Sequence, residues 1–207
     1  MTVKAKAAVK ATEKPKDKEQ TAEELINGLI DKSEKALDQL RTFSQEQVDK
    51  ICQNLALAAE EHHMDLAVSA AEETGRGVAE DKAIKNIYAS EYIWNNIRND
   101  KTVGIIDEDD ENQMITIADP LGVIAGVVPV TNPTSTVIFK SIIALKTRNT
   151  IIFSFHPQAF KSCLKTGQIL EAAAEAAGAG CWGRARQAVP SGVHDGDVQL
   201  LHRHLEK

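Results

Sequence analysis

The sequence feature that most restricts the fold is a change in hydrophobic period near Leu121. Residues 121–128 (LGVIAGVV) are followed by helix-like residues 133–146, and residues 150–155 (TIIFSF) by helix-like residues 157–177. Continuous apolar runs of this length are typical of parallel strands that are buried on both faces. A β-α-β-α order places both strands in one sheet with right-handed connections. The segment therefore predicts one half of a doubly wound, Rossmann-like nucleotide-binding domain.

The region before residue 50 divides into a polar tail and the start of a helical layer. Residues 1–20 hold six lysines and three acids, with little that is large enough to bury. Ordering them would cost more conformational entropy than their contacts return, so we expect a disordered tail. Helices are expected to begin at two capping-box patterns, Thr21 with Glu24 and Ser44 with Gln47, each followed by apolar residues at helical spacing.

Two more helices and a hairpin are expected before Leu121. One helix runs from Met64 to Gly75, a residue suited to a left-handed C-terminal cap. The next helix carries the apolar residues Ile84, Ile87, Tyr88 and Trp94. The β-rich runs at 102–106 and 113–119 flank the acidic residues 107–111, which cannot lie in a core, and this pattern predicts a hairpin with a solvated tip. The acidic residues lack the spacing of a calcium loop, so we assign them no metal.

Charge and composition exclude several classes of partner. The net charge of -6 and the pI near 5.5 argue against binding to nucleic acid or to an anionic membrane surface, because both reward basic patches. No stretch approaches the roughly 20 apolar residues of a membrane span, and the N-terminus has no apolar signal-peptide core. Cys52, Cys163 and Cys181 are odd in number and lack metal-ligand spacing, which favours a reducing compartment. We expect a cytoplasmic protein.

Polar residues follow each predicted parallel strand, at the edge where open α/β sheets bind ligands. After the first strand, Pro129 ends ladder pairing and Asn132-Pro133 opens a helix. Asn132 is either a helix N-cap or an amide donor to the negative oxygen that develops when a nucleophile attacks an aldehyde or thioester carbonyl. After the second strand, His156-Pro157 occupies the equivalent place. The ring of His156 contacts either the ribose or phosphate of a cofactor or the loop backbone.

Three segments of the chain resemble one enzyme family. They are residues 43–51 (FSQEQVDKI), 72–86 (EETGRGVAEDKAIKN) and 120–157 (PLGVIAGVVPVTNPTSTVIFKSIIALKTRNTIIFSFHP). They are similar to the aldehyde dehydrogenase half of bifunctional acetaldehyde-CoA/alcohol dehydrogenases, and the similarity covers about residues 21–179. The stretch VTNPTSTVIFKS and the Phe-His-Pro turn at 155–157 are typical of the CoA-acylating branch of the aldehyde dehydrogenases.

The resemblance implies a reaction and a set of site residues. Acyl-CoA would be reduced with NADH to an aldehyde, or the reverse, through a thioester on a cysteine. The residues implied to line the NAD site are Val127, Val128, Pro129, Val130, Thr131 and Asn132, with His156 and Pro157 near the cofactor. Asn132 would also be the oxyanion donor, and homo-oligomerisation is implied as well. The residues alone do not predict NAD binding, because Gly122 and Gly126 do not form a G-x-G-x-x-G fingerprint.

The resemblance also implies that part of the enzyme is missing. The nucleophilic cysteine of the family lies downstream of the matched residues, and Cys163 is expected to be a core residue whose raised thiol pKa makes it inert. Residues 180–207 depart from the family pattern and form an unmatched tail, as in an out-of-frame or truncated gene product. Within that tail, His202 and His204 lie two residues apart, so on a helix they would face different sides and could not bind one metal, whereas on a strand they could. Without further ligands we assign them no metal.

These observations predict an α/β fold with an N-terminal helical layer, a hairpin and an incomplete Rossmann-like sheet. Residues 21–179 would form part of an aldehyde dehydrogenase NAD-binding domain, with two parallel strands and one open apolar edge. The expected substrate is an acyl-CoA or an aldehyde. We expect this chain to be an inactive fragment of the enzyme, and the alternative is a non-catalytic interaction or assembly fragment.

Overall fold

The computed structural model of the protein describes residues 22–179 and 186–188. Its helical elements are α1 Ala22–Leu40, α2 Gln45–Glu61, α3 His63–Thr74, α4 Ala79–Ile87, the π-helical turn η1 Tyr88–Tyr92, α5 Ile93–Ile97, α6 Pro133–Lys146, the 3-10 turn η2 Pro157–Ala159 and α7 Phe160–Ala176. Its strands are β1 Gly104–Asp109, β2 Met114–Ala118, β3 Val123–Val128, β4 Thr150–Phe155 and β5 Arg186–Ala188. The expected tail at 1–20, the cap at Thr21, Cys181 and the histidine pair near the C-terminus lie outside the described residues. The proposed domain boundaries stay predictions.

The predicted α/β class is confirmed by a parallel sheet in the order β3-β4-β5. Strands β3 and β4 pair over their whole length, from Val123 opposite Thr150 to Val128 opposite Phe155. The expectation of only two parallel strands was wrong, because β5 pairs with residues 151–153 of β4. Among the described residues β3 remains an edge strand, as the expected open edge requires. The three residues of β5 are too few for an apolar run, and strand pairing through the main chain leaves no hydrophobic signature in the sequence.

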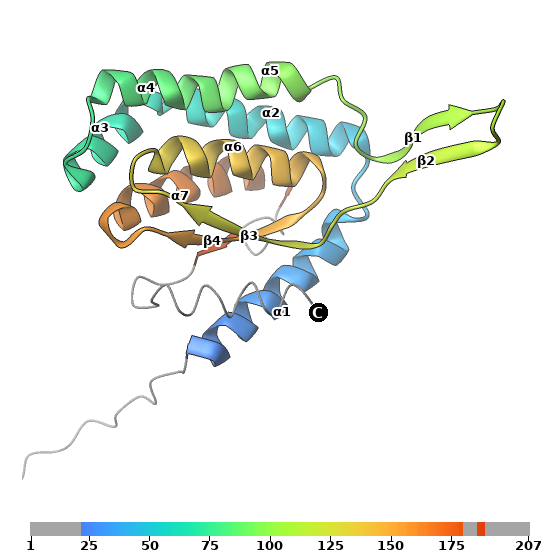
Figure 1. Cartoon of the computed structure of the whole chain (residues 1–207), viewed down its shortest axis with the longest axis horizontal. Helices are drawn as coiled ribbons and strands as arrows, with labels where there is room; N and C mark the ends of the chain where they lie inside the picture. The colour runs from blue at the N-terminus through green and yellow to red at the C-terminus, as the bar shows by residue number, and fades with distance from the viewer. Residues whose placement is uncertain (1–21, 180–185, 189–207) are drawn as a thin grey trace, which may run out of the picture.

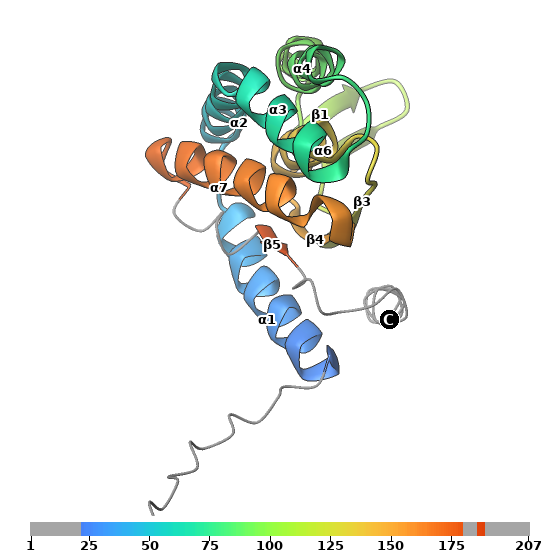
Figure 2. The same cartoon turned by 90° about the vertical axis from the view of Figure 1, so that its left-hand side faces the viewer.

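Helices cover both faces of this sheet. Figures 1 and 2 show α1 lying along one face and α6 with α7 along the other. Because side chains alternate along a strand, Ile152 packs with Ile26 and Leu29 of α1 in a small core. Its neighbours Ile151 and Phe153 belong to the main core on the other face, between the sheet and the helical layer. The sheet is thus buried in the manner that its continuous apolar strands predict.

Local signals in the helical layer are confirmed. Ser44 caps α2 in a full capping box: its Oγ accepts from the N–H of Gln47, whose Oε1 accepts from the N–H of Ser44 at 2.9 Å. Gly75 ends α3 in the left-handed conformation, with φ of 61°. Among the described residues, no helix combines the length and the apolar character that crossing a membrane requires.

The fourth expected helix is present, but most of its large apolar residues do not face the core. Ile84 is 65% exposed and Tyr88 61% exposed. The side chains that face the protein are smaller or polar: Lys82, Ala83, Asn86, Ala89 and Ser90. Buried Asn86 donates to the carbonyl of His63 and accepts from the hydroxyl of Thr134, at 2.9 and 2.8 Å. These polar contacts decide which face is buried, and the π-helical turn after Ile87 shifts the helical phase further.

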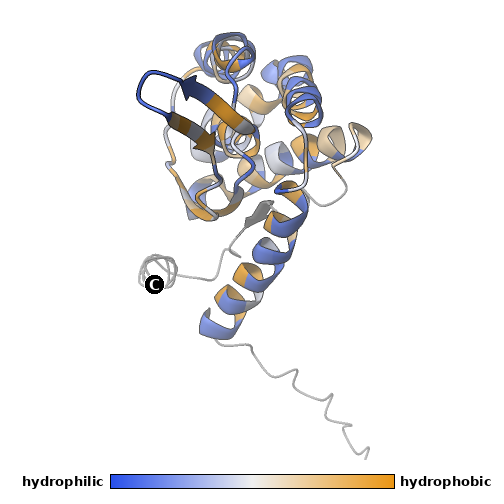
Figure 3. Ribbon diagram, turned by 90° about the vertical axis from the view of Figure 1, so that its right-hand side faces the viewer, coloured by the Kyte–Doolittle hydropathy of each residue, from blue (hydrophilic) through white to orange (hydrophobic). Residues whose placement is uncertain are grey.

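The predicted hairpin of β1 and β2 is confirmed, and in Figure 1 it projects from the helical body. Figure 3 shows that β2 and the base of β1 are hydrophobic, whereas the tip and the adjoining end of β1 are hydrophilic. Residues 107–109 of the acidic run that was expected at the tip belong to β1. At the tip, Asn112 donates from its backbone and its side chain to the Asp109 carboxylate, and these bonds lower the pKa of Asp109. Ile115 and Ile117 on β2 are 61% and 63% exposed. The hairpin therefore presents an apolar surface that the described residues do not cover.

Candidate functional site

The two segments predicted to bind the cofactor lie at one edge of the sheet. Val128 and Phe155 are paired at the ends of β3 and β4, so the residues that follow them leave the sheet side by side. In the first segment Val127, Pro129 and Thr131 are exposed, Val130 and Asn132 are half-buried, and Val128 is buried in the main core. In the second segment His156 is half-buried and Pro157 is exposed. The Val128 side chain thus faces the core, and the residue as a whole is only 2% exposed.

Asn132 occupies the N-cap position of α6, but its side chain makes no capping bond to the helix. Instead, its Oδ1 accepts from the Lys85 ammonium at 2.9 Å. Its Nδ2 lies 3.4 Å from the hydroxyl of Thr131, a long contact that leaves the amide able to donate elsewhere. The N-cap position that the sequence predicted for Asn132 is confirmed, but its side chain does not make the capping bond. Its oxyanion role stays a prediction.

Three lysines hold the end of β3 and the loop that follows it. Lys82 donates to the carbonyl of Thr131 at 2.9 Å, Lys85 donates to Asn132, and Lys140 donates to the carbonyl of Val127 at 2.8 Å. Burial lowers the pKa of Lys82, and the neighbouring charge of Lys85 lowers it further. Burial also lowers the pKa of Lys140. The edge of the site is thus rich in positive charge, which favours a ligand that carries or develops negative charge.

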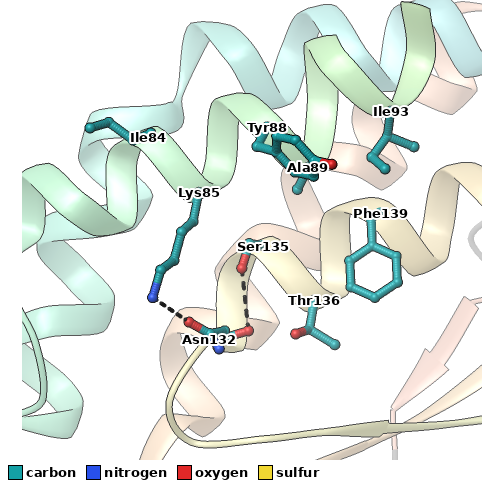
Figure 4. Close-up of a pocket in the computed structure, with 9 residues that line it drawn as sticks. All are labelled: Ile84, Lys85, Tyr88, Ala89, Ile93, Asn132, Ser135, Thr136 and Phe139. Atoms are coloured by element: carbon teal, nitrogen blue, oxygen red, sulfur yellow. Dashed lines mark hydrogen bonds between the residues drawn. The ribbon is translucent and has the colours of Figure 1, made fainter. Parts of the chain in front are cut away.

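A cavity of about 540 Å³ opens beside Asn132, between α4 with η1 and the first turns of α6. Its lining residues, shown in Figure 4, are Ile84, Lys85, Tyr88, Ala89, Ile93, Asn132, Ser135, Thr136 and Phe139. We call it the α4–α6 cavity. Its wall is mostly apolar, with the amide of Asn132 and the ammonium of Lys85 at one end, an arrangement typical of small-molecule sites.

The apolar face of α4 and η1 thus lines a cavity. The exposure of Ile84 and Tyr88 is explained by their place in the wall of the α4–α6 cavity. Sequence reasoning missed these side chains and the three lysines as site residues. Among the described residues, no group of His, Cys, Asp or Glu side chains is arranged to hold a metal ion.

His156 caps the short turn η2 with its ring. Its Nδ1 accepts from the N–H of Gln158 at 3.2 Å. The ring of His156 therefore contacts the loop backbone, which is one of the two alternatives that the sequence left open. Since a neutral imidazole carries its proton on the other nitrogen, Nε2 is the ring atom that can donate to a ligand.

The two described cysteines are core residues. Cys52 and Cys163 are fully buried, with 0% of each exposed. Burial raises the pKa of the Cys163 thiol to about 12, and Glu73 adds to the effect. Burial also raises the pKa of Cys52, whose Sγ donates to the carbonyl of Ile142 at 3.7 Å. The expectation that Cys163 is a buried thiol with a raised pKa is confirmed.

Comparison with known proteins identifies the family. The model of the aldehyde dehydrogenase family matches residues 8–202. The chain belongs to the aldehyde dehydrogenase family. This aldehyde dehydrogenase chain is 53% identical over 154 residues to the bifunctional aldehyde-alcohol dehydrogenase of Escherichia coli strain K12. The aligned residues make up 74% of this chain and 17% of that protein. The chain thus spans about a sixth of that curated relative, and it corresponds to the N-terminal acetylating region of such enzymes.

Solved aldehyde dehydrogenases share the fold. An acetylating aldehyde dehydrogenase from Geobacillus thermoglucosidasius superposes with a TM-score of 0.83 at 40% identity, over 88% of this chain and 40% of that one. A propionaldehyde dehydrogenase from Rhodopseudomonas palustris, solved with bound CoA and an acylated cysteine, superposes with a TM-score of 0.66 at 27% identity, over 79% of this chain and 36% of that one. Both similarities place the described elements within an aldehyde dehydrogenase domain.

Proposed function

We propose that this chain is part of a CoA-acylating, NAD-dependent aldehyde dehydrogenase, in which acyl-CoA, NADH and a proton are converted to an aldehyde, CoA and NAD⁺. The observation that carries the proposal is the Asn132 amide, which is held by Lys85 at the mouth of the α4–α6 cavity. The relatives named as acetylating enzymes and the relative solved with CoA support the same substrate class.

Asn132 would bind the carbonyl oxygen of the thioester. When a thiolate attacks the carbonyl carbon, negative charge develops on that oxygen, and a fixed amide N–H stabilises it. The amino end of α6 adds unpaired backbone N–H groups and the positive end of the helix dipole. Removal of one such donor typically slows a reaction by roughly 100- to 1000-fold. The apolar wall of the α4–α6 cavity would accept a short acyl chain and exclude water from it.

The residues at the sheet edge fit a dinucleotide. Val127 offers an exposed apolar side chain, 49% exposed, at the carboxyl end of β3, and residues 129–131 offer their backbone. His156 would donate from Nε2 to a ribose hydroxyl or a phosphate oxygen, and Pro157 would lie beside it. When bound, NADH supplies the hydride that reduces the acyl group, as family members use NAD or NADP.

The cofactor proposal is tested by titrating the ¹⁵N-labelled chain with NADH. The readout is the set of backbone amide signals in the NMR spectrum. Saturable shifts at Val127–Asn132 and at His156 would support it. A His156→Ala variant should bind more weakly, whereas His62→Ala, a change in a half-buried histidine far from this edge in sequence, should bind as the wild type does. Shifts confined to other parts of the chain would contradict the proposed site.

We also propose that the chain does not turn over acyl-CoA by itself. Cys52 and Cys163 are buried thiols of raised pKa, and neither is suited to attack a thioester. Purified chain should therefore give no acetyl-CoA-dependent oxidation of NADH. A Cys52→Ser/Cys163→Ser/Cys181→Ser chain provides the matched blank. Turnover that depends on any of these cysteines would refute the proposal.

The exposed hairpin favours a second candidate, an assembly module that contacts further copies of the chain. Ile115 and Ile117 project from one side of β2, and Thr116 from the other. If this surface mediates association, Ile115→Lys should shift the chain toward the monomer in light scattering. Thr116→Lys adds the same charge on the opposite face and should not. Equal behaviour of the two variants would exclude the hairpin as the contact.

A further inference from the structure

The orientation of the Asn132 amide is decided by Lys85. An ammonium group only donates hydrogen bonds, so the atom of the amide that faces Lys85 at 2.9 Å has to be Oδ1. A flipped amide would place its NH₂ group against the ammonium, donor against donor. Figure 4 shows Lys85 reaching down from α4 to this oxygen. The amide nitrogen is therefore directed away from the lysine.

The rest of the surroundings would not fix this orientation. The side chain makes no capping bond to α6, and its Nδ2 has only the long 3.4 Å contact to Thr131. The Asn132 carbonyl, which accepts from Thr136 at 3.2 Å, restrains the backbone but not the amide. Rotation of the amide about its last bond is thus opposed mainly by Lys85.

The position of Lys85 is itself prepared by the neighbouring turn of α4. Lys82, three residues earlier and 5% exposed, donates to the carbonyl of Thr131. Residues three apart lie on the same face of a helix, so the two lysines bond to adjacent residues of the loop. Lys82 holds the loop backbone, while the more exposed Lys85 reaches the amide beyond it.

We propose that Lys85 is a positioning residue, which orients the Asn132 amide so that Nδ2 is available to the substrate oxygen. The catalytic meaning of this role rests on the proposed function, but the orientation itself does not. Lys85 also lies at the boundary between the α4–α6 cavity and a second cavity of about 240 Å³, which is lined by Arg76, Lys82 and Thr131 as well. Its ammonium withdraws charge from the amide and makes the N–H groups stronger donors.

The test follows the Asn132 side-chain NH₂ signal of the ¹⁵N-labelled full chain by NMR relaxation. In the wild type we expect an ordered group, and in Lys85→Met an order parameter below about 0.6, the range of flexible groups. Lys85→Arg keeps a donor at this place and should restore most of the order. Lys35→Met, which removes an exposed lysine of α1, should leave the signal unchanged. Backbone spectra of each variant report whether the fold is retained.

An amide that is as ordered in Lys85→Met as in the wild type overturns the inference. Loss of order in Lys85→Met without recovery in Lys85→Arg also overturns it, because a donor at this place would then not be what orients the amide. A separate titration of the wild type with acetyl-CoA tests the proposed function. If acetyl-CoA leaves the Asn132 signal unmoved while Lys85→Met disorders it, the proposed function fails and the positioning role stands.

Discussion

At the scale of single residues, long-range polar contacts decide the chemistry that each side chain can perform. Asn132 would be an ordinary N-cap if only its neighbours in sequence mattered, but Lys85, 47 residues away, takes its oxygen. Lys82 reaches Thr131 across 49 residues. A buried ammonium is tolerated only where such acceptors are present. The lysines on α4 therefore require hydrogen-bond acceptors in the loop after β3, and the loop requires donors on α4.

Cys163 allows a prediction at this scale. Burial raises the pKa of its thiol to about 12, so the thiol stays protonated at pH 8. In a Cys181→Ser chain, an aromatic disulfide reagent should label neither Cys163 nor Cys52 while the chain is folded, because both thiols are buried and protonated. The same chain in concentrated urea should react at once, which is the internal control. Rapid labelling of the folded chain would contradict the assigned burial.

At the scale of elements, one buried ion pair joins α2 to α6. Lys146, 2% exposed, pairs with Asp49, donates to the carbonyl of Arg98 at 3.4 Å and lies 5.7 Å above the ring of Trp94. Asp49 is 30% exposed, so water screens part of the pair. Three helices, α2, α5 and α6, thus meet at one charged side chain.

Replacing Asp49 and replacing Lys146 should lower the free energy of unfolding by different amounts. Asp49→Ala leaves a buried ammonium without its anion and should lower the free energy of unfolding by about 2 to 3 kcal/mol, less than for a fully buried pair. Lys146→Met keeps the volume without the charge and should cost less. The double variant should be more stable than the sum of the two effects predicts. Urea unfolding measures all three, and a costlier Lys146→Met would contradict the argument.

Elements with local signals could be predicted from the sequence, and those that depend on distant partners could not. The bounds of α6 and β4 follow from Pro133 and from the apolar run 150–155, and the capping box at Ser44 marks the start of α2. The π-helical turn of η1, the buried polar face around Asn86 and the pairing of β5 have no such signal. In the site, Asn132 was found from its place after a strand, whereas Lys85 is bound to it only by the fold.

At the scale of the whole molecule, the parallel sheet is packed between α1 on one face and α6 with α7 on the other. α1 is the only described helix on the face that carries Ile152, whereas the opposite face is continuous with the main core. The small core under α1 contains few buried side chains, so it is expected to be the weakest layer. Local opening should begin there, before the helical layer around α2 and α6 loosens.

Replacement of Ile26 tests this order of stability. Ile26 is 1% exposed and packs against the sheet, so Ile26→Ala should cost about 2 to 4 kcal/mol. Leu57→Ala removes a side chain that is 54% exposed and should change stability by less than about 0.5 kcal/mol. If α1 opens first, Ile26→Ala should accelerate amide hydrogen exchange in α1 and β4 and increase the binding of a hydrophobic dye, while α2 stays protected. Equal acceleration in α2 would mean that the layers unfold as one unit, and the opening of α1 would then not be a separate event.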